Sequence, residues 1–338
     1  MKAHLTAKVD WLEFTIKNHT AECIINNLLL LSEADFTVLP KGRYGYSHQL
    51  KWSKGNLFVL YNEDDSPAND MGVHVLLSGS GCDTYSVHRE LLDLMQAIVQ
   101  HQCYKFTRID LAIDDMQGEL LVFDRIHHHA TAGLYTSRWA VWNEILTHKT
   151  SDNAYVGRTL YFGSRSSDIF CRVYDKTLEQ LYKHRNDEDE LEIPEKWTRL
   201  EIVYKKERAT LLAEHLSETE DLGVALRETL NNYIRFLEPT DTDVNRSRWS
   251  SAPWWATFID EAGQLSLTTT PADRSIEDMR SWIERQISPT LATILLADKG
   301  EMGWLKDALV TGKGRLKPKH YEAIEQYLND LSDQMKED

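Results

Sequence analysis

The sequence predicts an α+β protein, in which a largely antiparallel sheet with helices on one face is followed by a helical C-terminal region. Strand-like and helix-like segments follow one another without the regular alternation of a parallel α/β fold. Several neighbouring strand-like segments are separated only by short turns, which is typical of antiparallel pairing. From about residue 209 onward, helical patterns dominate. We therefore expect a sheet domain over residues 1–208 and a mainly helical region over residues 209–338.

The elements of the sheet domain are predicted from hydrophobic periodicity and turn residues. A strand at residues 9–16 precedes an apolar helix near residues 21–31. Two β-rich stretches flank the turn Ser53-Lys54-Gly55-Asn56 and predict a hairpin. The later elements follow in this order: strand 72–77 with a turn at 78–81, helix 87–100, strand 105–114, helix 119–130, a hairpin of strands 160–162 and 170–176, and strand 197–205.

The C-terminal region is predicted to consist of helices joined by polar segments. Its candidate helices share apolar residues at helical spacing: 209–214, 222–237, 276–286, 288–296 and 319–331. Residues 238–249 are polar and rich in turn formers, which favours a linker or loop. The acidic run at residues 186–190, inside the sheet domain, indicates a solvated loop.

Composition and charge exclude several classes of protein. With 42% hydrophobic residues in 338, the chain is too apolar to be disordered. A net charge of −15 argues against a surface covered throughout by nucleic-acid-binding residues, although a local basic groove is compatible with it. No apolar run spans a bilayer and no apolar signal segment begins the sequence, so we expect a cytoplasmic protein without a membrane partner. Four separated cysteines disfavour a disulfide scaffold.

The strand predicted at residues 105–114 carries charged side chains on one face. Because alternate residues of a strand share a face, Arg108, Asp110 and Asp114 point one way, with the small Ala112 between the carboxylates. Carboxylates gathered on a half-covered sheet are costly unless a cation or a basic group compensates them. The pattern therefore indicates room for a charged ligand.

Two later strands repeat this arrangement. On one of them Tyr174 lies between Arg172 and Lys176 on the same face, where positive charge favours the phenolate and holds a phosphate. On the other, Arg199 and Glu201 share a face. A simpler interpretation exists for each strand, in which the charges form exposed salt bridges and the tyrosine serves packing.

If the three strands lie side by side, they form an oxygen-rich cluster beside Tyr174. The carboxylates of this cluster are Asp110, Asp114 and Glu201. Hard divalent cations such as Mg²⁺ and Mn²⁺ prefer such ligands. The sequence thus predicts a metal site next to a phenol.

Five segments in one order resemble the replication initiation factors of the Rep_trans type. They are residues 9–12, 72–82, 106–114, 159–176 and 198–202. This family comprises rolling-circle initiators of plasmids and filamentous phages, and relaxases of some integrative conjugative elements. The resemblance extends to about Lys206, and segments 288–293 and 303–305 resemble phage-type members.

The resemblance implies an endonuclease that nicks one DNA strand at a specific sequence. The nucleophilic tyrosine of the family lies in an Arg-x-Tyr-(Asp/Asn)-Lys motif, which falls on Tyr174 here, with Arg172 and Lys176 holding the phosphate or lowering the tyrosine pKa. The acidic residues that would hold Mg²⁺ or Mn²⁺ are Asp110, Glu201 and, as a third candidate, Asp114. A 5′-phosphotyrosyl link and a free 3′-hydroxyl would result.

Basic residues on the sheet and near the C-terminus are the expected DNA contacts. They are Arg165 on the hairpin turn, Arg108 and Arg199 on the strands, and Lys313, Arg315 and Lys317 in the C-terminal region. The last three belong to residues 305–320, where five Lys/Arg accompany one Asp. A solvated loop is the alternative interpretation of that stretch.

The partner implied by the resemblance is origin DNA, single-stranded or supercoiled, with a host helicase and a second copy of the chain by family analogy. Initiation of rolling-circle replication of a phage or plasmid is the expected function, and nicking of a conjugative transfer origin is the alternative. A catalytically inactive DNA-binding regulator and an unrelated metal-dependent phosphoesterase stay open as other classes. The His-hydrophobe-His metal motif of many rolling-circle nucleases is absent, and we expect the histidines at residues 127–129 to be solvated or structural. His74 is expected to be a hydrogen-bonded structural histidine, with metal or DNA binding as the alternative.

Overall fold

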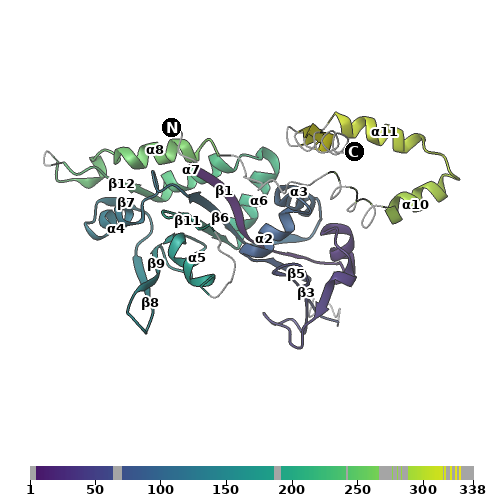
Figure 1. Cartoon of the computed structure of the whole chain (residues 1–338), viewed down its shortest axis with the longest axis horizontal. Coiled ribbons are helices and arrows are strands. Elements are labelled where there is room, and N and C mark those ends of the chain that lie inside the picture. The colour runs from purple at the N-terminus through teal and green to yellow at the C-terminus, as the bar shows by residue number, and fades with distance from the viewer. Residues whose placement is uncertain are drawn as a thin grey trace, which may run out of the picture. The chain divides into compact units, whose positions relative to one another are not determined.

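The computed structural model describes residues 5–63, 71–185, 192–240, 243–265, 276, 280, 283, 288–314, 316, 320–321, 324–325 and 327–328. Within them, ten strands form one sheet in the order β2-β3-β4-β5-β1-β6-β11-β10-β9-β8 (Figure 1). The neighbours from β3 through to β8 all pair antiparallel. The predicted α+β class with a largely antiparallel sheet is confirmed.

The strands have the following bounds: β1 Leu5–Ile16, β2 Phe36–Val38, β3 His48–Trp52, β4 Leu57–Tyr61, β5 Val73–Leu77, β6 Tyr104–Asp115, β7 Tyr135–Ser137, β8 Trp142–His148, β9 Tyr155–Phe162, β10 Ile169–Asp175, β11 Thr198–Lys205 and β12 Ile234–Phe236. The helices are α1 Ala21–Cys23, α2 Gly79–Ser86, α3 Leu91–Val99, α4 Phe123–Thr131, α5 Lys176–Lys183, α6 Glu207–Thr219, α7 Leu222–Tyr233, α8 Pro253–Ala262, α10 Ser288–Ala297 and α11 Gly303–Lys313. Strands β7 and β12 form a separate two-stranded sheet.

The core lies on one face of the central strands. Ile109, Leu111 and Ile113 of β6 are fully buried, as the alternation in the sequence predicts. Helix α6 packs against β6 and β11 on this face, and the Tyr204 hydroxyl of β11 donates to Thr229 Oγ1 of α7 at 2.8 Å. The opposite face of the same strands is therefore left for polar side chains.

Several local predictions were wrong. The helix expected at residues 21–31 is a single α-helical turn followed by a π-helical turn at Ile24–Leu28. The turn expected at residues 78–81 begins helix α2, because Gly81 lets the helix approach the carbonyl of Asn56, which a Cβ would meet at 2.2 Å. The helix expected at residues 222–237 ends at Tyr233, after which β12 pairs with β7.

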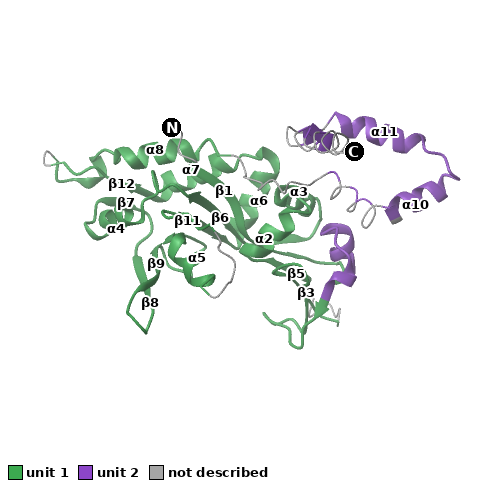
Figure 2. Ribbon diagram, viewed as in Figure 1, with its two compact units in different colours: residues 1–21, 37–268 green, residues 22–36, 269–338 purple. Residues whose placement is uncertain are grey.

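The chain divides into two compact units (Figure 2). Unit 1 comprises Met1–Ala21 and Thr37–Thr268, and unit 2 comprises Glu22–Phe36 and Thr269–Asp338. Helices α6, α7 and α8 thus belong to the same unit as the sheet, so the compact fold continues beyond residue 208, where the sequence placed a boundary. A division of function at that boundary stays a prediction.

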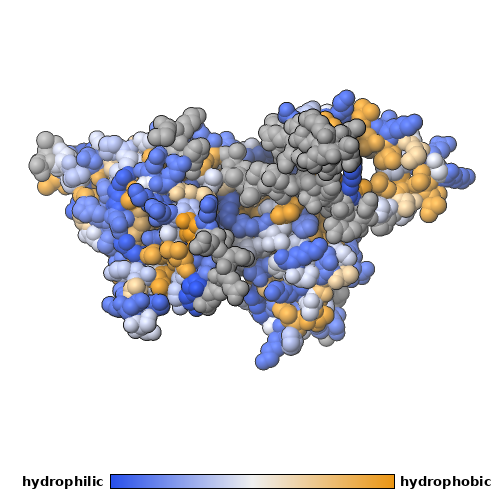
Figure 3. All heavy atoms as spheres, in the orientation of Figure 1, coloured by the Kyte–Doolittle hydropathy of each residue, from blue (hydrophilic) through white to orange (hydrophobic). Residues whose placement is uncertain are grey.

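The face in Figure 3 is mostly hydrophilic, and hydrophobic residues reach its surface in separate patches. Among the described residues, no helix is long and apolar enough to cross a membrane. No disulfide is formed by the described cysteines Cys23, Cys82, Cys103 and Cys171.

His74 makes the stability of the fold sensitive to pH. Its ring is buried on β5, with Nδ1 2.9 Å from Thr15 Oγ1, and Nε2 has no hydrogen-bond partner. Burial, together with the positive charge of Arg43, lowers the pKa of His74 to about 4. The unfolded chain binds a proton near pH 6.5, whereas the folded chain does so only near pH 4. Stability from neutral His74 is therefore complete above pH 6.5 and is lost as the pH falls toward 4.

We expect the free energy of unfolding to fall by up to about 3 kcal/mol more in the wild type than in a His74→Gln variant between pH 7 and pH 4. Urea unfolding across this range, followed by circular dichroism, measures the difference. Parallel pH profiles for the two proteins would show that His74 does not control this sensitivity.

Candidate functional site

The predicted site residues lie on the polar face of the central strands. Two lines of cross-strand neighbours carry most of them: Asp114–Arg199–Tyr174, and Ala112–Glu201–Arg172. Asp110 lies one step further along β6, opposite Val203. The strand order β6-β11-β10 thus brings together predicted site residues that are far apart in the sequence, such as Asp110 and Glu201, which are 91 positions apart. We call this surface the site face.

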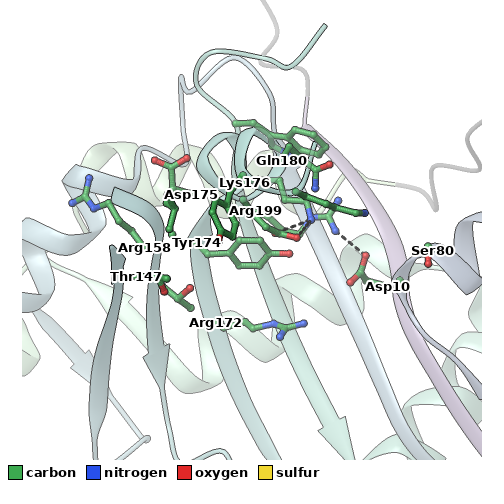
Figure 4. A pocket seen from close by; sticks show the side chains of 18 of the residues that line it. Asp10, Ser80, Thr147, Arg158, Arg172, Tyr174, Asp175, Lys176, Gln180 and Arg199 are labelled. Carbon is green, nitrogen blue, oxygen red and sulfur yellow. Dashed lines mark hydrogen bonds and ion pairs between the residues drawn. The ribbon is translucent and has the colours of Figure 1, made fainter. Parts of the chain in front are cut away.

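Tyr174 lies at the centre of the site face and is half-buried. Its hydroxyl donates to Glu201 Oε1 at 2.5 Å, and the guanidinium of Arg172 binds Glu201 Oε2. Figure 4 shows Tyr174 and Arg172 extending from β10 to the same side, toward Asp10 of β1. The phenol therefore lines a cavity, while its hydroxyl contacts the fully buried carboxylate of Glu201.

Two carboxylates of the site face, those of Asp110 and Glu201, are fully buried and are paired with guanidinium groups. Arg108 binds Asp110 through Nε at 2.8 Å and Nη2 at 2.6 Å, and Arg172 Nη2 lies 3.7 Å from Asp110 Oδ2. Burial nevertheless raises the pKa of Asp110, and burial also raises the pKa of Glu201 against the opposing charge of Arg172. Carboxylates held in this way can bind a further cation only if the arginines give up part of their contact with them.

The cations that flank Tyr174 do not activate its phenol in this arrangement. Burial raises the pKa of Tyr174 far above its usual range, and the charge of Glu201 raises it further. Arg172 donates to Glu201 and not to the phenol. Lys176 Nζ donates to both Glu179 oxygens at 3.0 and 2.9 Å and lies 5.3 Å from the Tyr174 ring centre. The expected lowering of this pKa is therefore absent from the structure.

Arg199 and Asp114 form a buried ion pair at the edge of the site. Arg199 binds Asp114 through Nε and Nη2, each at 2.7 Å, and binds Asp10 through Nη1 at 2.7 Å. Trp197 Nε1 also donates to Asp114 Oδ1 at 2.5 Å. Since all these groups are occupied, the geometry favours a positioning role for Arg199 and Asp114. The predicted DNA contact and metal ligation by these two residues stay predictions.

Sequence reasoning missed Asp10 as a member of the site. It lies where the pairing of β1 with β6 shifts register between Val9 and Trp11, and its charge raises the pKa of both Asp110 and Glu201. The only signal in the sequence is an aspartate directly before Trp11 that interrupts the alternation of the strand. The bulge turns this carboxylate onto the site face.

The site face opens into a cavity of about 590 Å³. Strands β1, β9, β10 and β11 and helices α2 and α5 contribute its lining. Asp10, Trp11, Tyr161, Arg172, Tyr174 and Lys176 are among the lining residues. Tyr174 thus borders this cavity together with charged and aromatic side chains from several elements.

Comparison with known proteins gives two family matches. A family described as "Replication initiation factor" matches residues 104–309, and one described as "Rolling Circle replication initiation protein N-terminal domain" matches residues 6–96. The chain belongs to the replication initiation factor family. The resemblance inferred from the sequence is confirmed, and Tyr174 lies within the first of the two matched regions.

Two relatives extend the similarity of this family member across most of its length. A protein of Bacillus subtilis (strain 168) named "Putative DNA relaxase NicK" is 29% identical over 340 residues, covering 98% of this chain and 93% of that protein. The solved structure of a rolling-circle replication initiator protein from Geobacillus stearothermophilus has a TM-score of 0.68 and 28% identity, and covers 78% of this chain and 99% of that chain.

The remaining predicted residues of this replication initiation factor have different surroundings. Arg165 is exposed on the β9–β10 turn, whereas Arg108 is tied to Asp110. Lys313 is exposed at the end of α11, and Arg315 and Lys317 lie outside the described residues. Within the described residues, no three His, Cys, Asp or Glu side chains are grouped as a metal site. His129 is held by the carbonyl of Arg125, consistent with a structural triplet.

Proposed function

We propose that this chain nicks and rejoins one strand of origin DNA through a 5′-phosphotyrosyl link to Tyr174, and so initiates rolling-circle replication of a phage or plasmid. The observation that carries the proposal is the Tyr174 hydroxyl in the cavity, hydrogen-bonded to Glu201 and close to Arg172. Membership of the replication initiation factor family supports it. The DNA reaches the phenol as a single strand, because the phosphate backbone has to enter the cavity.

The proposed step begins with transfer of the phenolic proton to Glu201 Oε1, its present hydrogen-bond acceptor. The phenolate oxygen attacks phosphorus, the bond from phosphorus to the 3′-oxygen breaks, and the 3′-oxygen leaves as a hydroxyl by taking up a proton from solvent water. Arg172 and Lys176 leave their carboxylate partners, bind the scissile phosphate and stabilise the charge on its oxygens. Because the link conserves the phosphoester, the reverse reaction rejoins the strand.

The site fits a divalent cation in the chemistry of its donors. Asp110 and Glu201 are hard oxygen ligands on one face, and Mg²⁺ is commonly bound by one or two carboxylates together with substrate phosphates. We propose that these two residues hold Mg²⁺ or Mn²⁺. When bound, the ion would neutralise the non-bridging phosphate oxygens and the leaving 3′-oxygen.

We expect EDTA to reduce nicking by about 100-fold or more, and Mn²⁺ to restore it. In a Glu201→Gln variant, half-maximal nicking should require at least about tenfold more Mn²⁺. Glu179→Gln is the matched control, because Glu179 lies in the cavity but is paired with Lys176. Full activity in EDTA, or equal Mn²⁺ dependence in both variants, would argue against ligation by Glu201.

The proposed function is tested by incubating the chain with Mn²⁺ and supercoiled DNA that carries the origin of the element encoding it. A covalent protein–DNA adduct with a free 3′-hydroxyl is the expected result. Cleavage without an adduct would favour an ordinary metal-dependent phosphoesterase instead. Binding without cleavage would favour an inactive DNA-binding regulator.

A second candidate function is nicking of a conjugative transfer origin. The match to the relaxase NicK over 98% of this chain favours it, and the same chemistry serves both functions. Nicking assays on both kinds of origin separate the two candidates. A host helicase and a second copy of the chain are proposed partners in either case.

A further inference from the structure

Three aromatic side chains on the site face are each covered by a cation. Arg108 lies 4.2 Å from the Trp11 ring centre, Lys205 lies 5.0 Å from that of Phe170, and Arg165 lies 5.6 Å from that of Tyr161. We call Trp11, Phe170 and Tyr161 the aromatic row. Stacking rings with adjacent cations are the features by which proteins bind single-stranded nucleic acid without reading its sequence.

Strand register places the aromatic row directly beside the catalytic residues. Trp11, Asp110, Val203 and Phe170 are successive cross-strand neighbours on β1, β6, β11 and β10. Tyr161 of β9 is the cross-strand neighbour of Arg172. Trp11 and Tyr161 are four strand spacings apart, roughly 19 Å, which only several nucleotides can span. Both rings also line the cavity of Tyr174.

Exposure and charge distinguish the members of the row. Trp11 and Tyr161 are partly exposed, whereas Phe170 is only 5% exposed and packs its ring against the ammonium of Lys205. Trp11 Nε1 donates to Glu13 Oε1 at 2.7 Å, which holds the orientation of the ring. Within the described part of the chain, neither Arg165 nor Lys205 forms an ion pair with a carboxylate. Lys205 Nζ donates to the carbonyl of Arg165 at 2.6 Å, which holds the ammonium beside the hairpin turn that carries Arg165.

We propose that the aromatic row binds single-stranded DNA beside the scissile phosphate, with bases stacked on Trp11 and Tyr161 and backbone phosphates bound by Lys205 and Arg165. The position beside the scissile phosphate rests on the proposed function, whereas binding by the row does not require Tyr174 to react. Bases in a duplex are already stacked on each other, so the row selects unpaired DNA.

The test measures binding of a fluorescein-labelled 20-nucleotide oligothymidylate to the full chain by fluorescence anisotropy at several salt concentrations. Trp11→Leu and Tyr161→Leu should each weaken binding about 5- to 150-fold, the range for loss of one stacked base. Trp11→Phe should restore most of the affinity. Arg165→Gln should lower the slope of log affinity against log salt by about one. Tyr155→Leu, which replaces an exposed tyrosine of β9 outside the cavity lining, is the matched control.

Unchanged affinity in Trp11→Leu and Tyr161→Leu, or the same loss with a 20-base-pair duplex, would overturn the proposal. Thermal unfolding of each variant identifies any that fail to fold, and exposed Arg165 supplies a variant that leaves the core intact. Oligothymidylate binding does not depend on nicking. If Trp11→Leu and Tyr161→Leu lose binding but the wild type forms no covalent adduct with origin DNA, the proposed function is refuted. The proposal that the aromatic row binds single-stranded DNA is then still supported.

Discussion

Replacing Tyr174 by phenylalanine is expected to abolish the covalent protein–DNA adduct and to reduce nicking by at least about 1000-fold, because the attacking oxygen is removed. The ring and its place on β10 are retained, so DNA binding and folding should persist. The lost hydrogen bond to Glu201 costs about 1.5–3 kcal/mol of stability at most, since Glu201 keeps Arg172. Gel electrophoresis of the adduct and of nicked plasmid measures both effects.

The control for this variant is Tyr155→Phe. Tyr155 is 50% exposed on β9 and does not line the cavity, so its hydroxyl should be dispensable. An adduct that persists in Tyr174→Phe at wild-type levels would place the nucleophile elsewhere.

Replacing Arg199 by alanine is expected to lower the free energy of unfolding by about 3–5 kcal/mol. Arg199 is 4% exposed and is the shared partner of Asp10 and Asp114, which are themselves buried. Without the guanidinium, buried Asp114 loses the cation that binds both of its oxygens, and Asp10 keeps Lys8 at 3.4 Å. Leaving a buried carboxylate without its cation costs more than the original pair contributed. Urea denaturation at neutral pH measures the loss.

Lys149→Ala is the matched control for that loss. Lys149 pairs with Asp152 at 3.7 Å, with both side chains about half exposed, and such pairs contribute at most about 1 kcal/mol. Similar small effects of the two substitutions would contradict the structural role assigned to Arg199. A loss of DNA affinity in Arg199→Lys with unchanged stability would instead favour the DNA contact first predicted from the sequence.

The site could be predicted in part because strands display alternate residues on opposite faces. Once the stretches around Asp110, Tyr174 and Glu201 are assigned to strands, their charged residues fall on one face of each strand. Nothing in the sequence orders the strands, and the order β6-β11-β10 is what joins those faces. Packing of α6 behind β6 and β11 then decides which face is left polar.

The chemistry inside the site could not be predicted from residue types alone. Arg172 was expected to face a phosphate or the phenol, but its nearest anion in the folded chain is Glu201. The flanking cations were expected to lower the pKa of Tyr174, but burial and the charge of Glu201 raise it. The place of Asp10 depends on a bulge, which shifts register by one residue and leaves only a weak trace in the sequence.

The most direct test of the central claim is mass spectrometry of the trapped protein–DNA adduct after digestion with nuclease and trypsin. Trypsin cuts after Arg172 and Lys176, so the reacted tyrosine is released in the four residues 173–176. We predict that this peptide carries the mass of a 5′-linked nucleotide. A nucleotide on any other peptide, with residues 173–176 unmodified, would contradict the assignment of Tyr174 as the nucleophile.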